Sequence, residues 1–263
     1  MSSGKNQERS DHFSRSMRRL EEIARALAQT GHARALIGYG STAEIDRFDQ
    51  YSDLDFLVVS GADGKEHLTR DTRWFADRHP VIYCTMHTDD GFRVVYDDGV
   101  LCDFGVVEET DLPGIAREKG RLIWSETDFD HSACGAVLLP GTDGSTPERH
   151  LGEVLWNLHV GLLRYARGEK LAAYRDIQEV AVRHLLHLVD GSPRGEIPAD
   201  PFVIERRYES RHPDPSRYLP HFLPGYEASP EAVLNILSFL EQKTELPEPF
   251  VSTIRRQAEA LRR

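Results

Sequence analysis

The sequence predicts an α/β (α+β) protein, in which a mixed β-sheet with flanking helices precedes a C-terminal helical bundle. Up to about residue 140, short apolar runs with strand character alternate with helical patterns. Residues 140–147 are rich in Gly, Thr, Asp, Ser and Pro, and beyond them only helical periodicity recurs. We therefore expect two domains, an α/β domain over 1–145 and a helical domain over 146–263.

The N-terminal half is expected to supply every strand of the sheet. Its elements, in order, are a helix over 16–29, a strand over 33–39, one or two helical turns over 42–48, a strand over 53–60, a helix over 65–78, and strands over 81–86, 92–96 and 100–107. Asp97-Asp98-Gly99 is a tight-turn sequence, so the last two strands should form a hairpin. We expect roughly the first ten residues to be a frayed tail.

The C-terminal half has the periodicity of helices joined by loops. Helices are expected over 148–167, 170–189, 229–242 and 248–263, with a short helical piece over 202–209. Gly168 separates the first two helices, and a Pro-rich loop over 193–201 precedes the short piece. These helices would form the bundle.

Composition and charge limit the class of protein. With 263 residues, 40% hydrophobic and 29% charged, the chain has an ordinary soluble composition, and it shows neither a bilayer-spanning run nor an apolar signal core. Cys84, Cys102 and Cys134 are too scattered for a disulfide framework or a zinc knuckle, which favours a cytoplasmic location. The net charge of −11 opposes a polyanionic partner, so we expect neither nucleic acid nor membrane binding.

The segment from Gly38 to Val59 is the most informative part of the chain. It combines an apolar strand, a Gly40-Ser41 turn and a new strand that opens with Asp53 and Asp55. Alternate side chains of a strand share a face, so the two carboxylates lie side by side and repel each other unless a cation or proton lies between them. Oxygen ligands of this kind suit Mg²⁺, and the turn offers an N–H and a hydroxyl to phosphates. The segment indicates a metal-dependent handler of nucleotides.

A third acid, Asp103, lies in the apolar run from Val100 to Val107. A charge is costly in apolar surroundings, so a buried strand aspartate needs a cation, a donor or a partner. A Mg²⁺ ion shared with Asp53 and Asp55 would explain all three acids. The expected chemistry is attack of a substrate hydroxyl on the α-phosphate of a nucleotide, with pyrophosphate leaving and one carboxylate accepting the proton. The structural alternative is an Asp-x-Asp in a solvated loop.

The order Gly40-Ser41, then Ser52-Asp53-Leu54-Asp55, then Asp103 resembles the signature of the DNA polymerase β-like nucleotidyltransferase superfamily. Within it, the chain is most similar to the antibiotic nucleotidyltransferases, the lincosamide and aminoglycoside adenylyltransferases. Residues 155–169, which run from Leu-Trp-Asn-Leu-His to Arg-Gly-Glu, resemble a helix of that group. The resemblance covers residues 33 to about 190, and the remainder stays unassigned.

The resemblance implies a mixed-sheet nucleotidyltransferase domain followed by a helical substrate-binding domain. It implies Asp53 and Asp55 as metal ligands and Asp103 as third ligand or general base. It also implies Gly40 and Ser41 as contacts to the triphosphate, Mg²⁺ as cofactor, and an NTP, first of all ATP, as co-substrate.

One departure from the family pattern follows the turn. Thr42-Ala43-Glu44 stands where the family usually has a second small residue or an arginine. A phosphate would repel Glu44, so we expect this side chain to face solvent or to cap a helix.

Other candidates are weaker, and for each a structural role is the favoured alternative. They are His87, Asp89 and Asp90 at the rim of a cleft, His184 and His187 at metal-compatible spacing, Trp156 and Tyr165 as pocket residues, Arg206 and Arg207 as anion contacts, and Glu153 as an alternative base. Solvated loops, helix packing and solvated surface account for such residues without a ligand.

The sequence thus predicts transfer of a nucleoside monophosphate from an NTP to a hydroxyl of a small molecule, with lincosamide or aminoglycoside antibiotics as leading acceptors. The acceptor is expected between the two domains, and a homodimer is left open. Two alternatives remain: a nucleotidyltransferase acting on RNA or protein, which the acidic balance disfavours, and a non-catalytic nucleotide-binding member, which the presence of all three acids disfavours.

Overall fold

The structure is a computed structural model that describes residues 2–137, 146–190, 200 and 202–262. The chain divides into two compact units, Met1–Pro140 and Gly141–Arg263, which we call the sheet unit and the helical unit. The first unit contains a mixed sheet and the second is helical, so the predicted fold class is confirmed.

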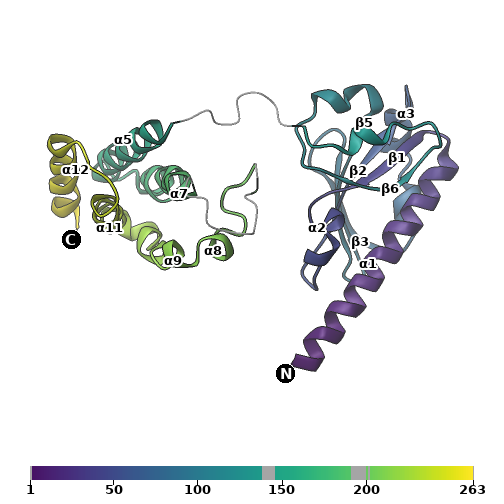
Figure 1. The fold of residues 1–263 in the computed structure, drawn as a ribbon, viewed down its shortest axis with the longest axis horizontal. Coiled ribbons are helices and arrows are strands. Elements are labelled where there is room, and N and C mark those ends of the chain that lie inside the picture. Colours follow the sequence, from purple (N-terminus) through teal and green to yellow (C-terminus); the bar gives the residue numbers. More distant parts are fainter. Residues whose placement is uncertain (1, 138–145, 191–199, 201, 263) are drawn as a thin grey trace. The chain divides into compact units, whose positions relative to one another are not determined.

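The sheet unit, drawn with its flanking helices in Figure 1, is built on six strands in the order β3-β4-β5-β2-β1-β6. Their bounds are β1 (Ala33–Gly38), β2 (Leu54–Ser60), β3 (Val81–Met86), β4 (Gly91–Tyr96), β5 (Leu101–Glu108) and β6 (Arg121–Ser125). Neighbouring strands are antiparallel except β2 and β5, which run parallel and make the sheet mixed. The five strands predicted from the sequence are all present, and β6 was not predicted.

The register of the central strands sorts their side chains onto two faces. Phe56 of β2 is opposite Phe104 of β5, which is opposite Phe92 of β4. Because directly opposite residues in a sheet point to the same side, the three rings share one face, and residues one position away share the other. We call the face with these rings the closed face and the other the open face.

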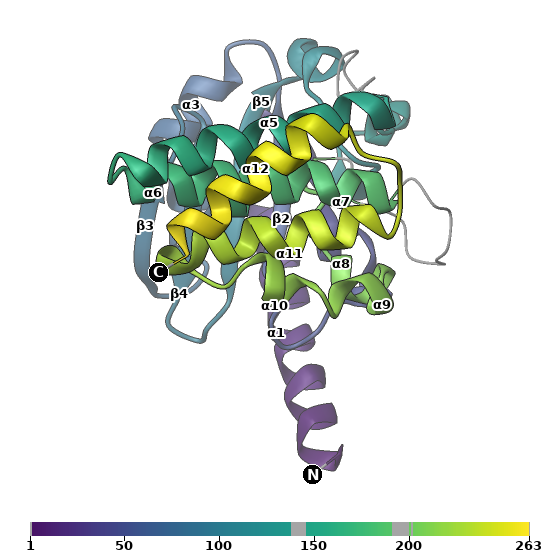
Figure 2. The ribbon, with the colours of Figure 1, turned by 90° about the vertical axis from the view of Figure 1, so that its left-hand side faces the viewer.

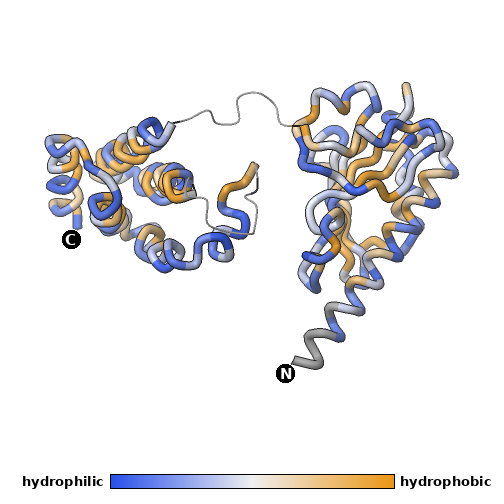
Figure 3. Tube along the Cα trace, viewed as in Figure 1, coloured by the Kyte–Doolittle hydropathy of each residue, from blue (hydrophilic) through white to orange (hydrophobic). Residues whose placement is uncertain are grey.

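The closed face carries the main apolar core of the sheet unit. The helices of this unit are α1 (Ser2–Thr30), α2 (Gly40–Ala43), α3 (Gly64–Arg70) and α4 (Arg73–Ala76), with 3₁₀ turns at Ile45–Arg47, Glu109–Gly114 and His131–Cys134. Leu20, Ile23 and Leu27 of α1 and Trp74 of α4 are buried against this face. Figure 3 shows the hydrophobic colouring concentrated on the strands of this unit.

The open face is covered over only part of its area. Over β1, the end of β2 and the end of β5, the segment after β5 contributes Leu112 and Phe129 to a small buried cluster with Ile37, Val59 and Val107. Over β3 and β4 and the beginning of β5, exposed and half-buried side chains remain. Asp103 lies on this uncovered part, and Asp55 is beside it at the beginning of β2.

Two details of the predicted helices of this unit are wrong. The first helix begins at Ser2, not near residue 16, so the expected frayed tail is helical. The helix expected over 65–78 is two short helices separated at Asp71 and Thr72. Asp71 accepts hydrogen bonds from the backbone N–H and side chain of Arg73, an alternative to helical bonding that ends α3 and begins a new turn.

The helical unit consists of helices packed around one apolar core (Figure 2). Its elements are α5 (Pro147–Ala166), α6 (Lys170–Tyr174), a π-helical segment (Arg175–Ala181), α7 (Val182–Asp190), α8 (Tyr208–Arg211), α9 (Pro213–Ser216), α10 (Leu219–Phe222), a 3₁₀ turn (Tyr226–Ala228), α11 (Ser229–Glu241) and α12 (Glu248–Leu261). The four long predicted helices are confirmed to within a few residues. The predicted helical piece over 202–209 is shorter and later, and the predicted loop over 193–201 lies outside the described residues apart from Asp200.

Local sequence explains where α5 begins and how closely it packs against the π-helical segment. The hydroxyl of Thr146 accepts a hydrogen bond from the Arg149 N–H at 3.3 Å, with Pro147 at the first helical position. A Cβ built on Gly161 would lie 2.4 Å from Cγ1 of Ile177, so glycine allows the π-helical segment to pack there.

Among the described residues, no helix is long and apolar enough to cross a membrane.

Candidate active site

Asp55 and Asp103 are directly paired across the two parallel strands of the sheet. Asp55 of β2 and Asp103 of β5 are register partners, so both carboxylates lie on the open face. Adjacent strands are about 4.8 Å apart, which brings the two side chains within reach of one ion. Asp53 immediately precedes β2, two residues before Asp55, and is half-buried as Asp55 is. Asp55 and Asp103 thus share the open face, and continuation of the alternation to residue 53 would give Asp53 the same face.

The turn after β1 lies against Asp55. Gly40 and Ser41 are the first residues of α2, and the Tyr39 N–H donates to the Asp55 carbonyl at 2.8 Å. The Asp55 N–H in turn donates to Oγ1 of the buried Thr42 at 3.0 Å. Gly40 has φ +52°, and a Cβ there would lie 2.9 Å from Oδ2 of Asp55. Glycine is thus required both by the left-handed backbone and by the close approach of this carboxylate.

Asp103 is less buried than the apolar sequence around it suggested. Its side chain is 38% exposed, and Nε of Arg93 on β4 donates to its Oδ2 at 3.0 Å. Nε2 of His87 lies 3.9 Å from its Oδ1. The premise that Asp103 is a buried charge is therefore wrong, because alternation turns it to the open face and Arg93 supplies a cation.

Side chains from two other elements hold the backbone around these acids. Nε2 of His12, on α1, lies 2.7 Å from the Ser52 carbonyl, one residue before Asp53. Nε of Arg121, at the start of β6, donates to the Thr42 carbonyl at 2.9 Å, and burial lowers the pKa of this arginine. The first contact fixes the segment just before Asp53, and the second fixes the turn that contains Gly40 and Ser41.

A further ion pair holds the loop between β3 and β4. Nζ of Lys65, on α3, lies 2.6 Å from Oδ2 of Asp90, and this hydrogen bond lowers the pKa of Asp90. The Asp90 carbonyl accepts from the Val106 N–H at 2.9 Å. The loop that carries His87 is thereby tied to both α3 and β5.

The weaker sequence candidates lie in different places. Of the predicted rim residues, His87 contacts Asp103, Asp90 binds Lys65, and Asp89 is exposed. In the helical unit, Nδ1 of His184 lies 2.9 Å from Nδ1 of His150, and the His187 ring stacks on His150 with centroids 4.7 Å apart. Parallel stacked rings do not share one in-plane metal position, so this trio is a packing arrangement.

The remaining candidates are surface or packing residues of the helical unit. Trp156 is 60% exposed, and Tyr165 donates to the Glu227 carbonyl at 2.9 Å. Arg206 pairs with Asp200 at 3.3 Å, and Arg207 has φ +59°. The Glu153 carbonyl accepts from the Asn157 side chain at 2.8 Å.

Arg93, His12 and Arg121 were missed by the sequence reasoning. For Arg93 a signal existed: a hairpin centred on Asp98 pairs residue 93 with residue 103, which is the observed register. His12 lies between the expected tail and the helix expected from residue 16, and Arg121 begins the unpredicted β6. Neither has a local pattern that indicates its contact.

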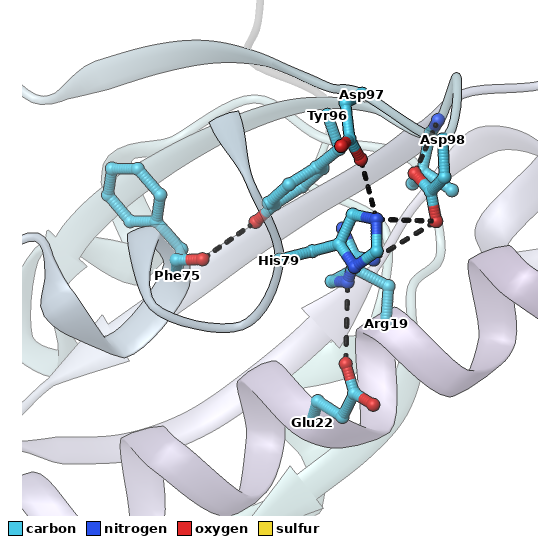
Figure 4. Close-up of polar contacts among 8 residues, drawn as sticks. Arg19, Glu22, Phe75, His79, Tyr96, Asp97 and Asp98 are labelled. Atoms are coloured by element: carbon cyan, nitrogen blue, oxygen red, sulfur yellow. Dashed lines mark hydrogen bonds and ion pairs between the residues drawn. The ribbon is translucent and has the colours of Figure 1, made fainter. Parts of the chain in front are cut away.

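A second group of potential metal ligands lies at the β4–β5 turn, next to α1. His79, Asp97 and Asp98 offer ligand atoms that all lie within 4.8 Å of one another. Figure 4 shows His79 beside the two aspartates and Arg19 beside Asp98. Nε2 of His79 lies 2.6 Å from Oδ1 of Asp97, and the Arg19 guanidinium lies 3.1 Å from Oδ2 of Asp98. The Arg19 guanidinium also lies 4.0 Å above the Tyr96 ring. This almost fully buried cation already neutralises Asp98, so we assign the group to the packing of α1 against the hairpin.

The open-face acids have the chemistry of a magnesium site. Their donors are carboxylate oxygens alone, the ligand type that Mg²⁺ prefers, and all three side chains are partly exposed. Asp53, Asp55 and Asp103 are therefore the residues that could hold the ion.

No model of a known protein family matches the sequence, and no curated protein matches it. Among solved structures, an aminoglycoside 6-adenyltransferase from Bacillus subtilis is similar at 13% identity and TM-score 0.35, over 92% of this chain and 97% of that one. A STING-associated CdnE c-di-GMP synthase from Capnocytophaga granulosa is similar at 10% identity and TM-score 0.34, over 96% and 81%. A nucleotidyltransferase-like protein from Exiguobacterium sibiricum is similar at 12% identity and TM-score 0.30, over 92% and 89%. At these TM-scores none of the three defines the family of this chain.

Proposed function

We propose that this chain is a Mg²⁺-dependent nucleotidyltransferase that transfers a nucleoside monophosphate from an NTP, first of all ATP, to a hydroxyl of a small molecule. The observation that carries the proposal is the in-register pairing of Asp55 with Asp103 beside the left-handed Gly40. A carboxylate pair next to a glycine turn provides both a cation site and room for a phosphate chain.

The residues have distinct roles in this proposal. Asp53 and Asp55 hold the metal, and Gly40 and Ser41 contact the triphosphate. When bound, Mg²⁺ neutralises charge on the phosphates and on the departing pyrophosphate. Asp103 is a third ligand or accepts the proton of the attacking hydroxyl. The hydroxyl oxygen forms a bond to the α-phosphorus, the bond from that phosphorus to the bridging oxygen breaks, and pyrophosphate leaves.

The acceptor is the finer part of the proposal. Lincosamide and aminoglycoside antibiotics are the leading candidates, and the domain over 146–263 is proposed to bind the substrate. The net charge of −11 favours a cationic or neutral acceptor over a polyanion. All three cysteines are free thiols, in keeping with a reducing compartment such as the cytoplasm.

The test is pyrophosphate release from each NTP in the presence and absence of Mg²⁺, with a panel of small hydroxyl compounds, tRNA and protein acceptors. We expect metal-dependent release with a small acceptor. Labelling of RNA or protein alone would promote a nucleotidyltransferase of macromolecules. Nucleotide binding without release under any condition would indicate a non-catalytic member. Size-exclusion chromatography with light scattering would settle whether the active form is a homodimer.

A further inference from the structure

The uncovered part of the open face carries a row of apolar side chains. Tyr83 on β3, Val95 on β4 and Leu101 on β5 are directly opposite one another in register, so their side chains share this face. Tyr83 is 58% exposed, Leu101 is 43% exposed and Val95 is half-buried. We call these three residues the apolar row.

The apolar row runs parallel to the row that contains the proposed catalytic acids. Thr85, Arg93, Asp103 and Asp55 are likewise opposite one another on β3, β4, β5 and β2. On β3, β4 and β5, each residue of the apolar row lies two positions along the strand from the residue of the acid-containing row, a separation of about 7 Å. A molecule of ordinary metabolite size that contacts Asp103 therefore also reaches Tyr83 or Leu101.

The direction of the proposed reaction decides which of the two substrates lies over the apolar row. The Gly40 turn contacts Asp55 from the β1 side of β2, whereas Asp103 lies on the other side of Asp55, followed by β4 and β3. In phosphoryl transfer the attacking and leaving oxygens are roughly in line on opposite sides of phosphorus. If the pyrophosphate leaves over the turn, the attacking hydroxyl enters from the β5 side. The body of the acceptor then lies over β4 and β3.

We propose that the apolar row binds the acceptor and that the acceptor is a hydroxyl compound with an apolar ring or chain. This inference rests on the proposed function. Exposed tyrosine and leucine side chains gain free energy when an apolar ring or chain covers them, and two residues of the row, Val95 and Leu101, have no attraction for an ammonium group. Arg93 lies in the neighbouring row beside Asp103 and is more than half exposed, which opposes a second cation at this position. The row therefore favours an apolar-bodied hydroxyl compound over a polyamine, and so narrows the acceptors proposed above by disfavouring the aminoglycosides among them.

The experiment uses the full chain with Mg²⁺ and an ATP analogue carrying a methylene bridge between the α- and β-phosphates. Affinity for this analogue is measured first, for the wild type and for Asp53→Asn. A phenyl glycoside and the matching methyl glycoside are then titrated as acceptor probes, with backbone amide shifts as the readout. The variants are Tyr83→Ser and Leu101→Ser. Met86→Ser is the control, because Met86 is half-exposed on the same edge strand but on the other face.

We expect the phenyl probe to shift the amides of Tyr83, Val95 and Leu101 and to bind more tightly than the methyl probe. Tyr83→Ser and Leu101→Ser should each weaken the phenyl probe about tenfold, and Met86→Ser less than about twofold. Affinity for the nucleotide analogue should stay within about twofold in these three variants.

Three results overturn the inference. If the phenyl probe binds no better than the methyl probe, or binds without responding to Tyr83→Ser, the apolar row is not an acceptor site. If the two serine variants lose nucleotide affinity instead, the row holds the nucleobase. If the wild type does not bind the magnesium–nucleotide complex, or Asp53→Asn leaves that binding unchanged, the proposed function itself fails, and the first measurement shows this separately.

Discussion

The two faces of β4, β5 and β2 differ in chemistry and in exposure. On the closed face, Phe92, Phe104 and Phe56 stack with ring centroids 4.7–5.3 Å apart and are almost fully inaccessible to solvent. On the open face, one residue away on the same strands, Arg93, Asp103 and Asp55 are partly exposed. The same six to eight residues of each strand therefore provide both the core and the candidate site.

This difference shows how a small sheet can combine stability with chemistry. The period-two alternation of a strand allows one face to gain apolar burial while the other holds polar groups at fixed spacing. The aromatic stack keeps the strands in register, and the register sets the distance between Asp55 and Asp103. Substitutions on the two faces should consequently have separable effects, on folding for one and on catalysis for the other.

The largest effect is expected from Asp55→Asn on the open face. Loss of one carboxylate should lower the rate of metal-dependent pyrophosphate release by about 10³-fold, because the cation and the phosphates lose their main contact. The free energy of unfolding should change by less than about 0.5 kcal/mol, because removing a charge from a carboxylate pair relieves repulsion. Asp89→Asn, an exposed acid of the β3–β4 loop, is the control and should retain full activity. Near-normal turnover of Asp55→Asn at saturating Mg²⁺ would exclude Asp55 from the metal site.

Phe104→Ala on the closed face should lower stability and leave nucleotide binding intact, the reverse of Asp55→Asn. Removal of a ring that packs on Phe56, Phe92 and Phe75 should lower the free energy of unfolding by about 3 kcal/mol, measured by urea denaturation. The folded fraction should keep its affinity for a magnesium–nucleotide complex. Leu101→Ala, on the same strand but exposed, should change stability by less than about 0.5 kcal/mol. Equal destabilisation by the two alanines would show that the faces are not energetically distinct.

Gly40→Ala tests the contact between the turn and the open face. A left-handed alanine costs about 1 kcal/mol, and its Cβ would also meet Oδ2 of Asp55 at 2.9 Å. Gly99→Ala has the same kind of backbone conformation, φ +83°, but its Cβ would meet nothing within 4 Å. Both variants should lose similar stability, whereas Gly40→Ala alone should lose about tenfold in affinity for the magnesium–nucleotide complex. Similar binding by the two variants would show that the close approach does not matter.

Tyr39→Phe gives the smallest effect, and it concerns the covered end of the open face. Burial raises the pKa of Tyr39 to about 12 from its ordinary value of 10. Between these values the unfolded chain loses the phenolic proton and the folded chain keeps it, so the stability that Tyr39 contributes falls as pH rises from about 10 to about 12. Its hydroxyl has no hydrogen-bond partner among the described residues.

The phenylalanine variant should therefore be as stable as the wild type at pH 7 and lose less stability above pH 10. Thermal unfolding followed at pH 7, 10 and 11.5 measures the difference between the two proteins. Identical alkaline profiles would mean that Tyr39 is solvated in the folded state.

The parts of the fold that could be predicted are those with local patterns. The alternation at Asp53 and Asp55 and the tight turn at Asp97-Asp98-Gly99 are short-range signals, and they located β2 and the β4–β5 hairpin. The four long helices followed from their apolar spacing for the same reason.

The rest depends on contacts between distant residues. That β2 pairs in parallel with β5, and so brings Asp55 opposite Asp103, is a choice of strand order that no single segment contains. The exposure of Asp103 depends on which face remains uncovered, and its partner Arg93 depends on register. Similarly, the short apolar run Leu122-Ile123-Trp124 becomes β6 by pairing with the edge of β1, a partner that the run itself does not specify.

The parallel pairing of β2 with β5 also has a kinetic consequence. Asp55 and Asp103 are 48 residues apart (103 − 55), so their contact closes a long loop that contains α3, α4, β3 and β4. Closing such a loop costs chain entropy before any long-range contact compensates for it, which makes non-local pairing slow. The β3–β4–β5 hairpins can form locally, but the pair of acids exists only after β5 has joined β2. Affinity for a divalent ion should accordingly appear late in refolding, so that ion binding would report completion of the sheet.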